Sequence, residues 1–141
     1  DKMNRDKLKA LYLKYELTSE DIFTKDIGFG DNKKTFTIIT RSGIEKIQGK
    51  ENIKVAYKVI KCETNFAVIK ATAFLDLKPI YTCETFGSAL KGNTYKDGNC
   101  QSWYVVEMAE KRALSRAVLK LTGFYELGVF GEDESDDFKK K

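Results

Sequence analysis

In three short stretches in the middle of the chain, apolar and polar residues alternate as is typical of β-strands. The stretches cover residues 53–63, 66–77 and 80–90. Only Thr64 and Asn65 separate the first two stretches, and Lys78 and Pro79 mark a second sharp reversal before the third. Because such short links join antiparallel neighbours, the pattern predicts a meander of adjacent strands.

The middle stretch has two different faces. Its apolar face consists of Ala67, Ile69, Ala71, Ala73, Leu75 and Leu77, and its other face of Phe66, Val68, Lys70, Thr72 and Phe74. Alanine side chains allow a helix to lie close to a sheet, so we expect a helix to cover the apolar face.

The strongest helical pattern follows a loop at 91–99 that is rich in glycine and asparagine. Ser102 is a candidate N-cap, and Gly123 suits the left-handed conformation that ends many helices. The expected buried arc contains Val106, Ala109, Ala113, Leu114, Ala117, Val118 and Leu121, with Glu110 inside it. The opposite side is expected to carry Tyr104, Ser115 and Leu119.

Shorter elements are expected on both sides of this centre. The pattern predicts an amphipathic helix at residues 4–16, a second helical turn at 18–23 and a loop at 28–34. It further predicts a strand at 35–40, a small helix at 41–52 and an apolar extension at 124–132. The fold class expected is therefore α+β: an antiparallel meander of three to four strands, a long C-terminal helix packed across one face, and short N-terminal helices.

Length and charge indicate one domain with an acidic end. A chain of 141 residues that is 42% hydrophobic can bury a substantial core, and we assign residues 1–130 to a single domain. Residues 131–141 hold five acids and three lysines, so we expect an acidic, disordered tail, and the rest of the chain has a surplus of basic residues. No apolar run predicts a membrane span and no signal-peptide pattern opens the chain, so we expect a cytoplasmic protein.

The residue types present argue against most catalytic chemistry. There is no histidine, and the three cysteines Cys62, Cys83 and Cys100 have no CxxC spacing, which disfavours a zinc site and any His-activated nucleophile. A metal-dependent enzyme would need carboxylates such as Glu63, Asp76 and Glu84, which are scattered over strand ends and form no DxD or ExK pattern. We therefore expect no catalytic residues, no metal and no cofactor.

Arg112, Arg116 and Lys120 recur every four residues along the long helix, with Lys111 beside them. In one interpretation these cations pair with acids elsewhere and solvate an edge. In the other they form an open row about 12 Å long that holds the phosphates of a polynucleotide.

Further lysines lie on the predicted strands. Lys58, Lys61, Lys70 and Lys78 lie on the first two strands or at their ends, and the aromatic residues Tyr57, Phe66 and Phe74 lie among them. Lysines next to exposed rings suit single-stranded nucleic acid, whose bases stack while its backbone is held electrostatically. The alternative, that the rings pack in a core or a subunit interface, stays open at this point. Glu110 could mark the edge of the helix's apolar arc, bond a backbone amide or meet a cation from a neighbouring subunit.

Three segments resemble the single-strand annealing proteins, which are the phage recombinases of the Erf, Sak and Red-beta type and their eukaryotic Rad-type counterpart. The segment "VIKATAFLDL" with "IYTCETFGSAL" is similar to their central hairpin and third strand, "AEKRALSRAVLKLTG" to the helix across the sheet, and "TIITRSGIEKI" to an upstream strand and helix. The resemblance covers about residues 35–128 and implies a non-enzymatic protein, encoded by a phage or prophage, that binds and anneals single-stranded DNA in recombination and repair without ATP.

The resemblance also implies site residues and partners. It assigns Arg112, Arg116, Lys120 and Lys111 on the helix, and Lys58, Lys61 and Lys70 on the hairpin, to DNA binding. It implies a homo-oligomeric ring or filament in a bacterial or phage-infected cell. A nuclease or a single-strand binding protein is a further candidate partner, and the expected tail is similar to the protein-docking tips of bacterial single-strand binding proteins. The alternative function is a protein-interaction or assembly module that binds no nucleic acid.

Overall fold

The structure is a computed structural model that describes residues 2–75, 81–94 and 96–134. It has an α+β fold with the elements α1 (Lys2–Lys14), β1 (Ile22–Ile27), β2 (Lys34–Ile39), α2 (Arg41–Glu51), β3 (Lys54–Cys62), β4 (Phe66–Leu75), β5 (Tyr81–Leu90), α3 (Val105–Thr122) and β6 (Val129–Gly131). Short 3-10 turns lie at Gly30–Asn32 and Tyr125–Leu127. None of the described helices is both long and apolar enough to cross a bilayer.

The predicted meander is confirmed as the sheet β3-β4-β5, in which both pairs of neighbours are antiparallel. The link between β3 and β4 is the tight turn expected at Thr64 and Asn65, closed by a hydrogen bond from the amide of Glu63 to the carbonyl of Phe66. The second predicted reversal lies at residues outside the described part of the chain. Burial alternates strictly along β4, so the alanine face is buried as expected.

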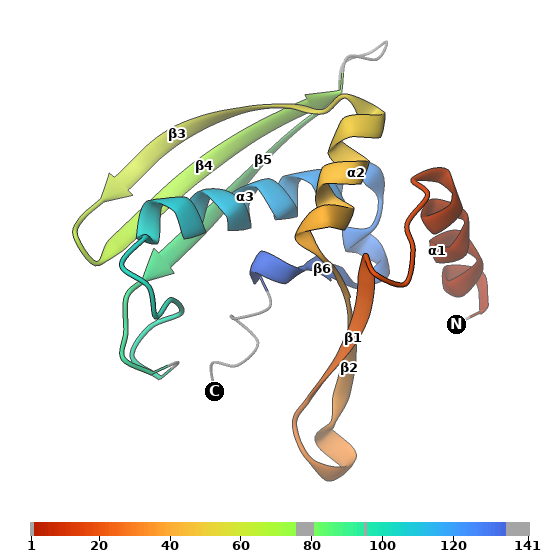
Figure 1. Ribbon diagram of the computed structural model, residues 1–141, viewed down its shortest axis with the longest axis horizontal. Helices are drawn as coiled ribbons and strands as arrows, with labels where there is room; N and C mark the ends of the chain where they lie inside the picture. The colour runs from red at the N-terminus through yellow and green to blue at the C-terminus, as the bar shows by residue number, and fades with distance from the viewer. Residues whose placement is uncertain (1, 76–80, 95, 135–141) are drawn as a thin grey trace.

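A second, smaller sheet was not predicted. Its order is β1-β2-β6, with β1 antiparallel and β6 parallel to β2. The expected helical turn at 18–23 is wrong because residues from Ile22 onward pair with β2 along the whole hairpin. Figure 1 shows this β1–β2 hairpin projecting away from the larger sheet.

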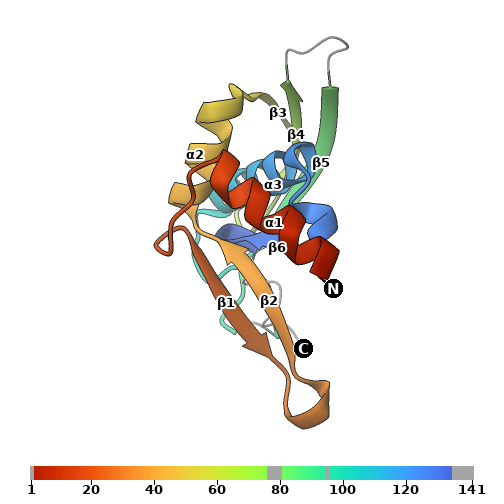
Figure 2. The same cartoon turned by 90° about the vertical axis from the view of Figure 1, so that its right-hand side faces the viewer.

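Helix α3 lies between the two sheets, which decides how much of it is buried. It packs across β4 and β5 on one side and touches β6 on the other (Figures 1 and 2). Ser115 and Leu119, which the sequence places opposite the buried arc, are therefore buried as well. Helix α3 ends at Gly123, whose φ of 89° is the left-handed end that the sequence predicts.

The domain extends further than residue 130. Gly131 belongs to β6, and Asp133 and Glu134 are buried. The expectation of a disordered tail is thus wrong for residues 131–134, and residues 135–141 are outside the described part. Asp133 forms an ion pair with Arg41 of α2 at 2.9 Å, and Glu134 forms one with Arg116 of α3 at 3.2 Å, so both buried carboxylates have charged partners.

Candidate nucleic-acid interface

The row of cations predicted on α3 does not form an open surface, because its first member is buried. Arg112 is 1% exposed. Its guanidinium donates hydrogen bonds to three main-chain carbonyl oxygens: Nε to Asp133 at 3.0 Å, Nη1 to Ser88 at 2.8 Å and Nη2 to Asn99 at 2.6 Å. Arg112 therefore ties β5, the loop before α3 and the C-terminal segment together, which corrects the interpretation of three open cations in a row.

Arg116 is also engaged within the domain. Its Nε lies 3.2 Å from a carboxylate oxygen of Glu134, and its Nη1 donates to the carbonyl of Phe86 at 2.7 Å. Its side chain is 28% exposed and that of Glu134 is 3% exposed, so this ion pair is largely shielded from water. Of the two interpretations weighed for the helix, pairing with acids elsewhere is the one that Arg116 follows.

The remaining helix cations lie on different surfaces. Lys120 is exposed, with its ammonium group 5.2 Å from the ring centroid of Tyr125. Lys111 is half-buried and lines a small pocket with Arg41 and Asp133. Since the four predicted cations share no common open surface, α3 offers no groove of its own for a phosphate backbone.

Arg112 and Arg116 bond main-chain groups at the edge of β5 that no described strand pairs with. An edge strand presents main-chain groups that lack partners, and proteins cover such groups to prevent unwanted pairing. Arg112 and Arg116 bond the carbonyls of Ser88 and Phe86, while the side-chain oxygen of Asn99 accepts the amide of Leu90 at 2.8 Å. Side chains therefore cover this edge of the sheet between Phe86 and Leu90.

The strand lysines, in contrast, lie together. The face of the β3-β4-β5 sheet that points away from α3, which we call the outer sheet face, has no described element packed on it. Figure 2 shows α3 on one side of this sheet only. The pairing register places these charged and aromatic residues on the outer sheet face: Lys54, Lys58, Lys61, Phe66, Lys70, Phe74, Glu84 and Phe86.

The register also gives the spacing on this face. Lys58 lies opposite Lys70, and Phe86 lies opposite Lys70 from the other side, so the three form one row across the sheet. Phe66 and Phe74 are eight residues apart on β4, which corresponds to about 26 Å, and the row of Lys70 lies midway between them. The rings and ammonium groups therefore follow a line long enough for several nucleotides.

The outer sheet face carries a surplus of positive charge. Lys61 lies 3.3 Å from Glu63 and Lys70 lies 3.7 Å from Glu84, both at partly or fully exposed positions where such pairs contribute little. Among the described residues, no ion pair is found for Lys54 or Lys58. Like charges that face each other across an antiparallel pair, as Lys58 and Lys70 do, repel unless an anion neutralises them.

The prediction that Tyr57 accompanies these lysines is wrong. Tyr57 lies opposite Ala71 and so points to the inner side of the sheet, where α3 packs. Burial, reinforced by the negative charge of Glu110, raises the pKa of the Tyr57 hydroxyl to about 12. Glu110 itself is exposed and marks the edge of the apolar arc of α3, which was one of the alternatives for this residue.

Two members of the outer sheet face escaped the sequence analysis. Lys54 and Phe86 were not among the candidate residues, although period-two alternation places Lys54 with Lys58 and places Phe86 with Glu84 and Ser88. Phe86 is 49% exposed. The polar residues Glu84 and Ser88, two positions before and after Phe86, are the sequence signal that could have identified it.

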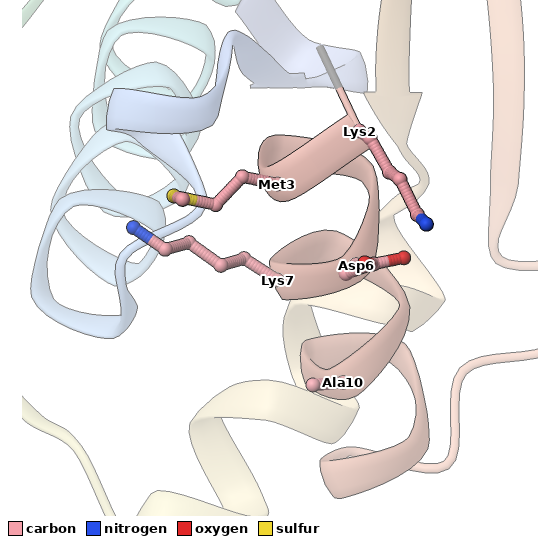
Figure 3. A pocket seen from close by; sticks show the side chains of 5 residues that line it. All are labelled: Lys2, Met3, Asp6, Lys7 and Ala10. Carbon is pink, nitrogen blue, oxygen red and sulfur yellow. The ribbon is translucent and has the colours of Figure 1, made fainter.

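The described residues include no group of three or more His, Cys, Asp or Glu side chains placed to hold a metal ion. A shallow hollow on α1 is lined by Lys2, Met3, Asp6, Lys7 and Ala10, with Met3 and Lys7 pointing the same way and no aromatic ring among the five (Figure 3). In Figure 1, α1 lies at the opposite end of the molecule from the β3–β4 turn.

Comparison of the chain with models of protein families, with curated proteins and with solved structures finds no match.

Proposed function

We propose that this protein binds single-stranded DNA on the outer sheet face and promotes the annealing of complementary strands, without a chemical step. One observation carries the proposal: an uncovered antiparallel sheet face that combines Lys54, Lys58 and Lys70 with the rings of Phe74 and Phe86. Ammonium groups hold a flexible phosphate backbone, and phenylalanine rings offer stacking surfaces to bases of any sequence.

The proposed mechanism is electrostatic. Lysines neutralise phosphates and release their counterions, which lowers the repulsion between two strands that approach each other. Bases that stack on a ring keep their hydrogen-bonding edges free for a complementary strand. Assembly into a ring or filament and recruitment of a nuclease or a single-strand binding protein, which the sequence resemblance implies, are parts of the same proposal and would extend the bound length of DNA.

A salt series on a fluorescent oligonucleotide tests the proposal. We expect anisotropy to report binding whose logarithmic salt dependence has a slope of about −3 if the four lysines of the outer sheet face, Lys54, Lys58, Lys61 and Lys70, all contact phosphates. The double variant Lys58→Gln/Lys70→Gln should bind more weakly, with a slope shallower by about 1.4. The matched control is Lys7→Gln/Lys9→Gln, which removes the same charge from exposed positions on α1. Equal affinities and slopes for both variants would refute the proposed interface.

The geometry also determines which variant can separate DNA binding from a role in assembly alone. Removing Arg112 and Arg116 would disturb the fold, since both bond main-chain carbonyls of β5. Lys58→Gln/Lys70→Gln changes exposed or half-buried side chains instead. Loss of annealing between two dye-labelled complementary strands, with unchanged sedimentation, would support DNA binding. Loss of assembly with retained annealing would support the interaction module.

A further inference from the structure

The two edges of the β3-β4-β5 sheet differ in how their main-chain groups are satisfied. On the edge formed by β5, side chains of Arg112, Arg116 and Asn99 bond main-chain groups between Phe86 and Leu90. On the edge formed by β3, which extends over nine residues, the described part of the chain places neither a strand nor a hydrogen-bonding side chain. Figure 1 shows β3 as the outermost strand. This edge can accept a further strand.

Large apolar side chains are exposed along the same strand. Tyr57 is 41% exposed, Val59 is 56% exposed, and Ile60, at an irregularity in the pairing, is 49% exposed. Tyr57 and Val59 point to the inner side of the sheet, but α3 packs over β4 and β5 and leaves them partly uncovered. An edge strand that only has to avoid pairing can do so with lysines and needs no exposed apolar side chains. Three exposed apolar side chains beside them indicate a surface that is covered in a complex.

The charges of β3 indicate what kind of strand fits. Lys54, Lys58 and Lys61 lie on its outer side, and the strand contains no acid. A second copy of β3 paired antiparallel would bring lysines opposite or next to lysines, which is unfavourable. A strand with acids on the outer side and apolar side chains on the inner side would match both the lysines and the pair Tyr57 and Val59.

We propose that the free edge of β3 binds an extended, acidic segment of a partner protein, which joins the sheet as a fourth strand. Main-chain hydrogen bonds to β3 supply affinity, as in other cases of strand addition, and the alternation of acidic and apolar side chains supplies specificity. This site goes beyond the proposed function: it takes a peptide rather than a nucleic acid, and it adds the edge and the inner side of the sheet to the lysines of β3.

Strand addition has a signature that charge attraction lacks. Alternate residues of an added strand point their amides toward β3, and the others point theirs away. We would use a nine-residue probe peptide that alternates glutamate and valine, matching the length of β3. Two further versions carry N-methyl groups on all glutamates or on all valines. We expect the parent peptide and one methylated version to bind, and the other methylated version to lose binding.

Two point variants separate this site from the outer sheet face. Val59→Ser should weaken binding of the parent peptide about tenfold, because it removes an apolar contact, and should leave oligonucleotide binding unchanged. Phe86→Ala should do the reverse. The proposal is overturned if the parent peptide does not bind, if both methylated versions bind equally well, or if Val59→Ser has no effect. None of these outcomes depends on whether the oligonucleotide binds, so the two proposals can fail separately.

Discussion

Gly87 of β5 lies directly against the main chain of α3 at Ala109. A β-carbon at position 87 would stand 2.1 Å from the carbonyl oxygen of Ala109 and 2.6 Å from the amide nitrogen of Ala113. One turn away, the hydroxyl of Thr85 donates to the carbonyl of Ala113 at 2.7 Å. The helix therefore contacts the sheet through its backbone, and the small residues on both sides make this distance possible.

Gly87→Ala should consequently destabilise the protein. The added methyl group meets main-chain atoms, which cannot rotate away, so α3 must shift, at a cost of about 1–3 kcal/mol or more in the free energy of unfolding. Urea denaturation measures this loss. Gly49→Ala is the control, because a β-carbon at this position in α2 meets no atom within 4 Å and alanine favours a helix. A Gly87→Ala protein as stable as the wild type would contradict the close packing.

Arg112→Lys should be destabilising even though it keeps the charge. A lysine ammonium cannot reach the three carbonyl oxygens that the planar guanidinium bonds, so at least one would remain buried without a donor. We expect a loss of about 3 kcal/mol in the free energy of unfolding. Lys120→Arg, the reverse exchange at an exposed position of the same helix, should change it by less than about 0.5 kcal/mol. Comparable values for the two exchanges would argue that Arg112 is not structural.

The C-terminal acids should contribute to stability through the arginines that they hold. Glu134→Ala removes the carboxylate that pairs with Arg116 and leaves a largely shielded guanidinium without that partner, at a cost of about 2 kcal/mol. Thermal unfolding monitored by circular dichroism would show it. Glu126→Ala, at an exposed position, is the control. If both variants melt at the wild-type temperature, residues 131–134 do not anchor to α3.

Asp21 should make stability depend on pH in the acid range. Burial alone would raise the pKa of Asp21, but hydrogen bonds from Lys46, Thr18 and Ser42 outweigh burial and lower the pKa to about 2. A carboxyl group whose pKa is lowered by folding stabilises the protein above its unfolded pKa. This contribution, about 2 kcal/mol, should be lost as the pH falls from about 4 to about 2.

Denaturation of Asp21→Asn across this pH range checks the assignment. The variant should be less stable than the wild type at neutral pH, and the difference should shrink as the pH approaches 2. Asp31→Asn, at an exposed position in the β1–β2 loop, should keep the wild-type dependence. A constant difference between Asp21→Asn and the wild type would show that the carboxylate does not titrate as described.

Phe86→Ala should weaken oligonucleotide binding by about 1–3 kcal/mol, the range found for the loss of one stacked base. The ring is half-exposed, so the fold should tolerate the change. Anisotropy with a labelled oligonucleotide gives the affinity, and Phe23→Ala, a partly exposed ring on β1, is the control. An effect of the same size in both variants would remove Phe86 from the interface.

Much of the larger layer could be predicted because its signals are local. Alternation in β4, the two-residue turn at Thr64 and Asn65, and the glycine that ends α3 act within a few residues, and each is confirmed. The lysines of β3 and β4 share a face for the same reason, since the period of a strand fixes side-chain direction. Residues 35–40 and 41–52 likewise became the strand β2 and the helix α2.

The second layer and the state of the helix cations depend on contacts between distant parts of the chain. An i, i+4 row of basic residues looks the same in sequence whether it faces water or a buried carbonyl. Arg112 is buried because it bonds Ser88 and Asp133, which lie 24 residues before it and 21 residues after it in the sequence. Residues 22 and 23, which were expected in a helical turn, belong to the strand β1 because β2 offers them partners. Periodicity thus determines which side chains share a face, while the free energy of packing determines which faces remain open.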